Sequence, residues 1–131
     1  MPRDVEITDQ LLNALAMVES QNNPQAVGDR GLRYPAYGAY QMRQPAFEDV
    51  RRLRPQDASG IEQLSSILGQ PDRQRQLARA YLGILDQNYG LDSLEDILAA
   101  YNAGIGTVRK KRVPSATHDY VQRILQLLNQ P

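Results

Sequence analysis

The sequence contains no cysteine, no tryptophan, one histidine and one phenylalanine among its 131 residues. The lack of cysteine excludes disulfides and thiol catalysis and leaves the redox compartment open. With a single histidine as well, few soft metal ligands remain, so a zinc site is not expected. We therefore predict that the protein uses neither a metal nor another cofactor.

An excess of charge of either sign is also absent, since fifteen basic residues balance fifteen acidic ones. A neutral total argues against nucleic acid or an anionic membrane as the main partner. No apolar run is long enough to span a membrane, and the first ten residues, MPRDVEITDQ, lack the apolar segment of a signal peptide. We expect a monomer that does not insert into membranes. The localisation therefore stays open. Either the protein is exported without a signal peptide of this type, or the given chain has already been trimmed.

The overall amino-acid composition is ordinary for a folded protein, with 41% hydrophobic and 23% charged residues. A chain of this length forms one domain, here residues 1–131. Helical patterns dominate, and we predict a mainly α domain of about six to eight helices. At most a small β element is expected near residues 34–43, in the YGAYQM segment.

Capping residues, prolines and glycines mark the ends of the predicted helices. These run from Thr8 or Asp9 to Ser20, from about Pro45 to Pro55, from Pro71 to about Gly90, from Ser93 to Gly104, and from about Thr117 onward. A short apolar stretch occupies residues 61–69. Residues 21–35 are rich in Asn, Pro, Gly and Asp and are predicted as loop.

One acidic residue, Glu19, interrupts the apolar face of the first helix. At about 100° per residue, and with Leu11 at zero, Leu15 falls at about 40°, Glu19 at about 80° and Leu12 at about 100°. The carboxyl group therefore lies inside the arc that should face the core. A glutamate at a helix end usually reaches water, and it is rarely buried without a partner.

Burial and the negative end of the helix dipole would both raise the pKa of Glu19. Fold stability does not call for an acid at this position, whereas a general acid benefits from both effects. Glu19 is thus the first candidate for a catalytic residue.

Four segments occur in a fixed order: MVESQNNPQAV, YGAYQM, ILAAYNAGIGTV, and the tyrosine of HDYVQRIL. Together they resemble the motifs of the lytic transglycosylases, lysozyme-like enzymes that cut peptidoglycan and are related to goose-type lysozyme. The resemblance extends from about Leu12 to Leu125 and implies a lysozyme-like fold with a cleft.

The resemblance implies a role for each matching position. Glu19 corresponds to the catalytic glutamate, and a late tyrosine, Tyr120, is expected to point its hydroxyl toward it. The expected substrate-binding residues are Ser20, Gly38, Tyr40, Gln41, Tyr101, Asn102 and Tyr120, with Asp29 and Tyr37 as further candidates.

The sequence departs from the family pattern in the loop before YGAYQM. Gly28 stands where many relatives have a serine, the stretch GDRGLRYPAYG is longer than usual, and Ala39–Tyr40 replaces a common Leu-Met pair. These departures make Asp29 and Tyr40 candidate substitutes for the group that holds the acetamido side chain of the sugar.

Three further features have two readings each. Tyr34, Tyr37 and Tyr40 recur every third residue and either stack on sugars or pack the loop onto the core. The basic run from Arg109 to Arg112 is read as a solvated loop rather than a nucleic-acid patch. His118 is read as a surface residue near a helix start rather than a catalytic group.

The resemblance implies cleavage of the glycan strand between N-acetylmuramic acid and N-acetylglucosamine by a single acid, giving 1,6-anhydromuramic products. A hydrolytic lysozyme or chitinase-type enzyme on the same scaffold is the first alternative. It would need a second carboxylate, for which Asp29, Glu48 and Asp49 are the nearest candidates in sequence. A non-catalytic glycan-binding or virion structural module is the second alternative.

Overall fold

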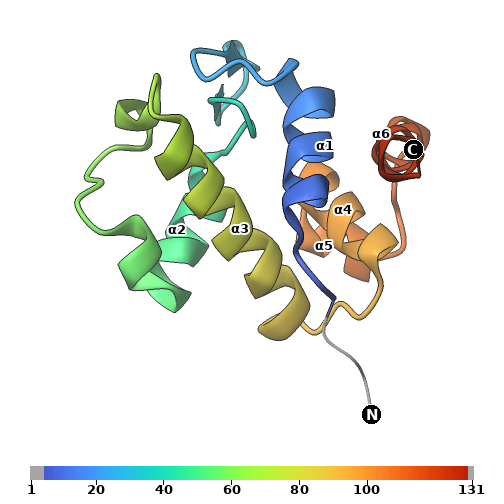
Figure 1. The fold of residues 1–131 in the computed structure, drawn as a ribbon. Helices are drawn as coiled ribbons and strands as arrows, with labels where there is room; N and C mark the ends of the chain where they lie inside the picture. Colours follow the sequence, from blue (N-terminus) through green and yellow to red (C-terminus); the bar gives the residue numbers. More distant parts are fainter. Residues whose placement is uncertain (1–4, 130–131) are drawn as a thin grey trace.

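The computed structural model describes residues 5–129 of the chain. Helices make up most of these residues, with one small antiparallel sheet (Figure 1). The elements in chain order are α1 (Asp9–Ser20), β1 (Val27–Gly28), β2 (Ala36–Tyr37), α2 (Gln44–Leu53), the short 3-10 helices η1 (Pro55–Ala58) and η2 (Leu64–Ile67), α3 (Pro71–Gln87), α4 (Leu94–Ala103), α5 (Ile105–Arg109) and α6 (Ser115–Leu128).

The helix ends follow local chemistry that is visible in the sequence. The Thr8 side chain accepts a hydrogen bond from the Leu11 amide at 3.0 Å and caps α1. Ser93 caps α4 in the same way, accepting from the Asp96 amide at 3.1 Å. A proline in the first turn, where a missing N–H costs nothing, opens both α2 and α3.

The apolar core is built around α3, the longest helix, which packs against α1, α2 and α4, while α6 covers α1 and α4 (Figure 1). Fully buried leucines from α1, α3 and α4 meet in it, among them Leu12, Leu15, Leu82 and Leu98. Each such side chain contributes about 1.5–3 kcal/mol by leaving water. This core holds the C-terminal end of α1, and therefore Glu19, in a fixed place.

The structure agrees with the predicted helices and differs in three details. The β element expected near residues 34–43 is present as β2, but its partner β1, paired through Val27 and Tyr37, was not predicted. Helix α5 was missed because it is a single short turn after Gly104. Helix α6 begins at Ser115, two residues before the expected start, because Pro114 supplies the extended residue that precedes it.

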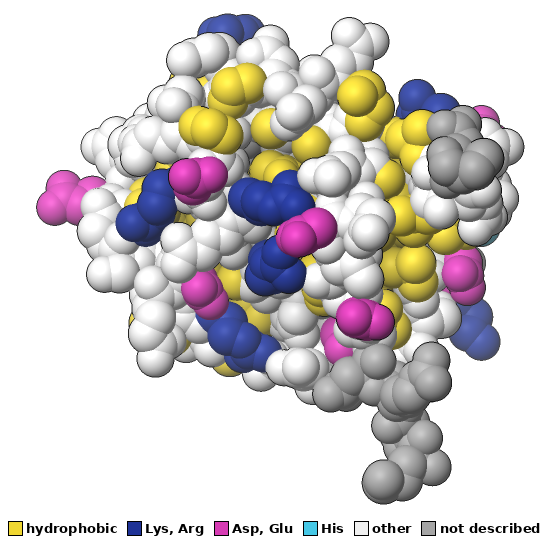
Figure 2. Space-filling model, viewed as in Figure 1, with side chains coloured by type: hydrophobic (Ala, Val, Ile, Leu, Met, Phe, Trp, Pro, Cys, Tyr) yellow, Lys and Arg dark blue, Asp and Glu magenta, His cyan; other side chains and the backbone are white. Residues whose placement is uncertain are grey.

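Charges of both signs are interspersed over α3 and the start of α1, and hydrophobic side chains gather between α1 and α6 (Figure 2). Lys110, Lys111 and Arg112 lie exposed in the turn after α5, and His118 is exposed on α6. Within residues 5–129, no helix combines the length and apolar character needed to cross a membrane. No three potential metal-binding side chains cluster in this same part of the chain.

Candidate active site

Glu19 lies in the last turn of α1 and is partly buried. The hydroxyl group of Tyr120, on α6, donates a hydrogen bond of 2.6 Å to its Oε2 atom. The Oε1 atom accepts no hydrogen bond from the described residues. One carboxyl oxygen is therefore held in place, while the other is available to a ligand.

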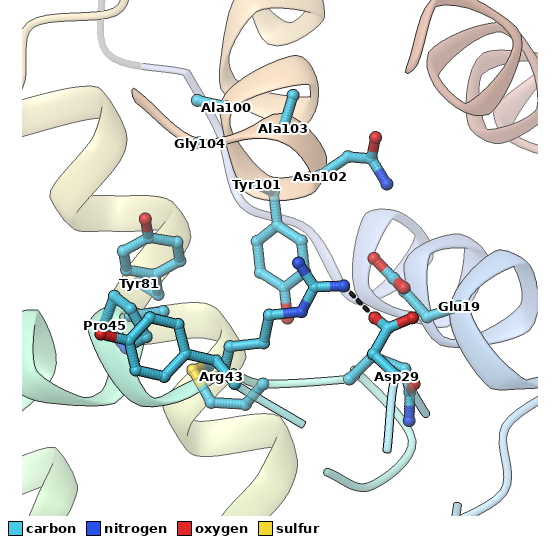
Figure 3. A pocket seen from close by; sticks show the side chains of 14 residues that line it. Glu19, Asp29, Arg43, Pro45, Tyr81, Ala100, Tyr101, Asn102, Ala103 and Gly104 are labelled. Atoms are coloured by element: carbon cyan, nitrogen blue, oxygen red, sulfur yellow. Dashed lines mark hydrogen bonds and ion pairs between the residues drawn. The ribbon is translucent and has the colours of Figure 1, made fainter. Parts of the chain in front are cut away.

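A pocket of about 220 Å³ opens beside this carboxyl group (Figure 3). Residues from five separate parts of the chain line it: the end of α1, the loop after β1, the segment from Gln41 into α2, Tyr81 of α3, and the end of α4. Five of the residues expected from the sequence meet here, namely Glu19, Asp29, Gln41, Tyr101 and Asn102. Tyr34 lines the pocket as well.

The surroundings of Glu19 raise its pKa from 4.5 to about 7. Burial is the largest cause, because it penalises the ionised carboxylate. The hydrogen bond from Tyr120 opposes this shift, as do the positive charges of Arg43 and Arg123, whereas the negative charge of Asp29 adds to it. Near neutral pH the protonated and the ionised form of the Glu19 carboxyl group are therefore both populated.

Tyr101 and Asn102 stand at the end of α4 and line the pocket (Figure 3). The Tyr101 hydroxyl donates a hydrogen bond to the Tyr40 carbonyl oxygen at 2.7 Å, and this bond fixes the orientation of the Tyr101 ring. The Asn102 Oδ1 atom accepts from the Thr117 hydroxyl at 2.7 Å. This bond turns the amide nitrogen of Asn102 toward the side of Glu19, where it can donate to a ligand.

Asp29 and Arg43 form an ion pair at the open edge of the pocket (Figure 3). Asp29 was a candidate from its position in the sequence, whereas Arg43 was not predicted. The signal for Arg43 was weak, because a basic residue just before a helix is common on protein surfaces. Both side chains are more than a third exposed, so the pair remains accessible to a ligand.

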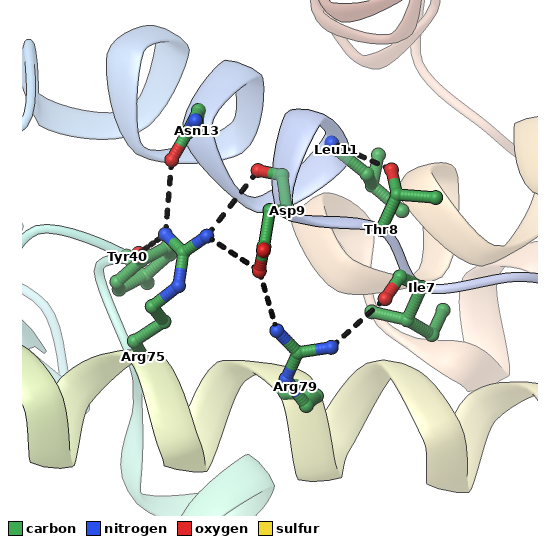
Figure 4. Close-up of polar contacts among 8 residues, drawn as sticks. All are labelled: Ile7, Thr8, Asp9, Leu11, Asn13, Tyr40, Arg75 and Arg79. Atoms are coloured by element: carbon green, nitrogen blue, oxygen red, sulfur yellow. Dashed lines mark hydrogen bonds and ion pairs between the residues drawn. The ribbon is translucent and has the colours of Figure 1, made fainter.

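Four of the expected substrate-binding residues lie outside the lining of the pocket. Ser20 donates its hydroxyl to the Ala39 carbonyl oxygen at 2.7 Å, Gly38 is buried, and Tyr37 lies half-buried in β2. The Tyr40 ring is buried, and its hydroxyl accepts a hydrogen bond of 2.9 Å from Arg75 (Figure 4). Arg75 in turn binds Asp9, so Tyr40 belongs to a network that joins α1 to α3.

Gly28, a position at which the sequence departs from the pattern of the lytic transglycosylases, lies directly against the Gln41 side chain. A Cβ atom at position 28 would be 2.2 Å from Gln41 Oε1, far inside contact distance. The Gln41 amide nitrogen donates to the Gly38 carbonyl oxygen at 3.0 Å, which fixes its direction. The absence of a side chain at Gly28 thus leaves room for the amide group of Gln41, which lines the pocket.

The other two carboxylates considered from the sequence lie outside the pocket. Glu48 is exposed on α2 and binds Arg51 and Gln44. Asp49 accepts a hydrogen bond of 2.7 Å from the Tyr89 hydroxyl and pairs with Arg52. Asp29 is therefore the second carboxylate of the site among the described residues.

Residues 3–122 match the family described as the Transglycosylase SLT domain, and the chain belongs to this family. The resemblance found from the four motifs is thereby confirmed. No curated protein sequence gave a match.

Two solved structures share the fold. The chain is similar to the 70 kDa soluble lytic transglycosylase from Escherichia coli, with a TM-score of 0.77 and 24% identity over 93% of this chain and 21% of that one. It is also similar to an inactive mutant of the lytic transglycosylase Slt from Pseudomonas aeruginosa, with a TM-score of 0.74 and 20% identity over 92% of this chain and 21% of that one. The chain thus spans about a fifth of the length of these proteins. The mainly α, lysozyme-like architecture is confirmed.

Proposed function

We propose that the protein is a peptidoglycan lytic transglycosylase in which Glu19 acts as both general acid and general base. The observation that carries the proposal is the Glu19 carboxyl group itself, held by Tyr120 on one oxygen and open to the pocket on the other. Membership of the transglycosylase family supports the reaction class. The substrate is the glycan strand of the bacterial cell wall, cut at the β-1,4 bond between N-acetylmuramic acid and N-acetylglucosamine.

The reaction needs two proton transfers at one carboxyl group. Protonated Glu19 gives its proton to the glycosidic oxygen, and the bond from that oxygen to the muramic anomeric carbon breaks. The carboxylate then takes the proton of the muramic C6 hydroxyl while that oxygen bonds to the anomeric carbon. Glu19 ends the cycle protonated, and the product carries a 1,6-anhydro ring.

The raised pKa of Glu19 suits both transfers. A group with a pKa of about 7 is protonated often enough to act as an acid and is basic enough to remove a proton afterwards. The Tyr120 hydroxyl can remain hydrogen-bonded to Oε2 in both states, so the carboxyl group keeps its orientation through the cycle. No second acid is required, because the nucleophile is part of the substrate.

The rest of the pocket offers contacts for a sugar chain. The amides of Asn102 and Gln41 can bind hydroxyl or acetamido groups, and the exposed ring of Tyr34 provides a flat apolar surface for a sugar face. The Asp29–Arg43 pair at the edge adds polar groups of both signs.

A hydrolytic lysozyme is the second candidate, and one observation favours it. Asp29 lines the same pocket as Glu19 and could position a water molecule for attack on the anomeric carbon. Its carboxylate is bound to Arg43, which competes with that role.

Cleavage of purified peptidoglycan in heavy-oxygen water separates these candidates. Attack by the C6 hydroxyl takes no oxygen from the solvent, so we expect unlabelled anhydro products that are lighter than hydrolytic ones by one water molecule. Mass spectrometry of the released fragments provides the measurement. Labelled reducing ends that disappear in the Asp29→Asn variant would instead establish hydrolysis. No cleavage at all would leave a glycan-binding module.

Gly28→Ala should lower activity more than stability. The added methyl group displaces Gln41, and a misplaced binding group costs roughly tenfold or more in rate. The displaced atom is the far end of a flexible side chain, so the melting temperature should hardly change. Gly83→Ala is the matched control, because a Cβ atom there meets nothing within 4 Å. Equal activity in both variants would show that the contact with Gly28 does not matter.

A further inference from the structure

The turn that carries Gln41 has an unfavourable backbone conformation. Gln41 has φ of +51°, in the left-handed region that residues with side chains rarely adopt. Such a conformation is strained and persists only where its surroundings hold it. Backbone hydrogen bonds between Tyr37 and Met42, at 2.9 and 3.0 Å, close the base of this turn. We call residues 38–42 the glutamine turn.

Three helices hold the glutamine turn at two adjacent residues. The Ser20 hydroxyl, next to Glu19, donates to the Ala39 carbonyl oxygen at 2.7 Å. The Tyr101 hydroxyl donates to the Tyr40 carbonyl oxygen at 2.7 Å. The Ala39 amide donates to Oε1 of Gln74, on α3, at 2.9 Å. Ser20 and Tyr101 adjoin the pocket, whereas Gln74 reaches the turn from inside the protein.

Gln74 is only 2% exposed, and its side-chain amide makes three hydrogen bonds. Besides accepting from the Ala39 amide, its Nε2 atom donates to the carbonyl oxygens of Pro24 at 2.9 Å and Ile67 at 2.7 Å. It therefore joins the loop that follows Glu19, the glutamine turn and η2. The fit is close, since a Cβ atom at Gly38 would lie 2.6 Å from Gln74 Cδ.

A buried amide is a costly way to fill a core, because each of its polar atoms must find a partner. An apolar side chain of similar length could fill the same volume, but it could not bind the Ala39 amide. Gln74 is absent from the described lining of the pocket, so it makes no contact there with a bound ligand. Its hydrogen bonds instead fix two loops that flank Glu19.

We propose that Gln74 is a positioning residue of the active site, which holds the glutamine turn so that the Gln41 side chain faces the pocket beside Glu19. This inference rests on the proposed function, since Gln41 is taken as a substrate contact. Loss of the Gln74 amide releases Ala39, allows the turn to relax from its left-handed conformation and moves Gln41. The expected result is a loss of kcat/KM of roughly tenfold or more.

The test compares Gln74→Met, which keeps the length of the side chain and removes its hydrogen bonds, with Gln76→Met. Gln76 lies on the same helix, is exposed, and bonds only Asp57 among the described residues. Activity on purified peptidoglycan and the side-chain amide NMR signals of Gln41 are both measured. We expect Gln74→Met to shift the Gln41 signals and lose activity, and Gln76→Met to do neither.

A double-mutant cycle separates positioning from general destabilisation. If Gln74 acts through Gln41, the variant with Gln41→Ala and Gln74→Met should be no less active than Gln41→Ala alone. Independent, multiplying losses would overturn the inference. Val50→Ala, in the core of α2, controls for stability, since it should lower the melting temperature without moving the Gln41 signals.

If Gln74→Met does not fold, Gln74→Glu takes its place. Glutamate keeps the acceptor for the Ala39 amide, and a protonated carboxyl group keeps one donor. We expect wild-type Gln41 signals at acidic pH and shifted signals as that carboxyl group ionises, because the carboxylate then faces the carbonyl oxygens of Pro24 and Ile67 with no donor for either. Unshifted Gln41 signals in folded Gln74→Met, or in folded Gln74→Glu above the pH at which its carboxyl group ionises, would overturn the inference. An inactive wild-type chain would overturn the proposed function instead, and the Gln41 signals would still test the role of Gln74.

Discussion

Replacing Glu19 with Gln should reduce cleavage of purified peptidoglycan by ~10²-fold or more, the scale of general acid–base catalysis. The amide has the shape of the carboxyl group and can still accept the hydrogen bond that Tyr120 donates. It has no proton to give at neutral pH and cannot act as a base. The protein should therefore remain folded and bind glycan strands while losing the chemical step.

Glu48→Gln is the matched control for this substitution. Glu48 is an exposed glutamate on α2 outside the pocket, and its neutralisation should leave the rate within a factor of about two, as expected of a surface change. Rates are compared by release of soluble fragments from labelled peptidoglycan, with circular dichroism to verify folding. A Glu19→Gln protein that cleaves at a near wild-type rate would end the proposed mechanism.

The position of Glu19 could be predicted because helical periodicity is a strong local signal. Leu11, Leu12 and Leu15 define the buried face of α1, and the carboxyl group falls within it by simple geometry. The helix ends were predictable for a similar reason, since capping by Thr8 and Ser93 depends on residues three positions apart.

The features that were missed depend on contacts between distant residues. The pairing of Asp29 with Arg43 joins residues fourteen positions apart across an irregular loop. Strand β1 is two residues long and carries no alternating pattern. The direction of the Tyr40 side chain is set by Arg75 of α3, thirty-five positions away. No local pattern in the sequence specifies any of these.

Gln74 illustrates the same limit in the core. In the sequence it falls on the apolar stripe of its helix, three residues before Leu77 and seven before Tyr81, but this pattern does not show what a buried amide there would bind. Burial and three specific partners, from residues 24, 39 and 67, distinguish it in the structure. Its importance follows from the loops that pack around it rather than from its own helix.

Glu19→Gln should also stabilise the protein, and the gain should depend on pH. Below about pH 4.5 the glutamate is protonated in the folded and unfolded chain alike, and its burial costs little. As pH rises, the unfolded chain loses this proton near 4.5, whereas the folded chain keeps it until about pH 7. The folded state therefore loses stability across this window, up to about 3 kcal/mol above pH 7. A glutamine carries no such cost.

The free energy of unfolding, measured by urea denaturation of the wild type and the variant, tests this expectation. At about pH 4 the two proteins should be nearly equal in stability, and at about pH 8 the variant should be more stable by up to about 3 kcal/mol. Glu48→Gln should show no such pH-dependent gain, because that side chain is exposed. A gain of the same size at both pH values would mean that packing, rather than ionisation of Glu19, causes it. No gain at about pH 8 would mean that the folded protein ionises Glu19 without penalty, which would remove the physical basis for its action as an acid near neutral pH.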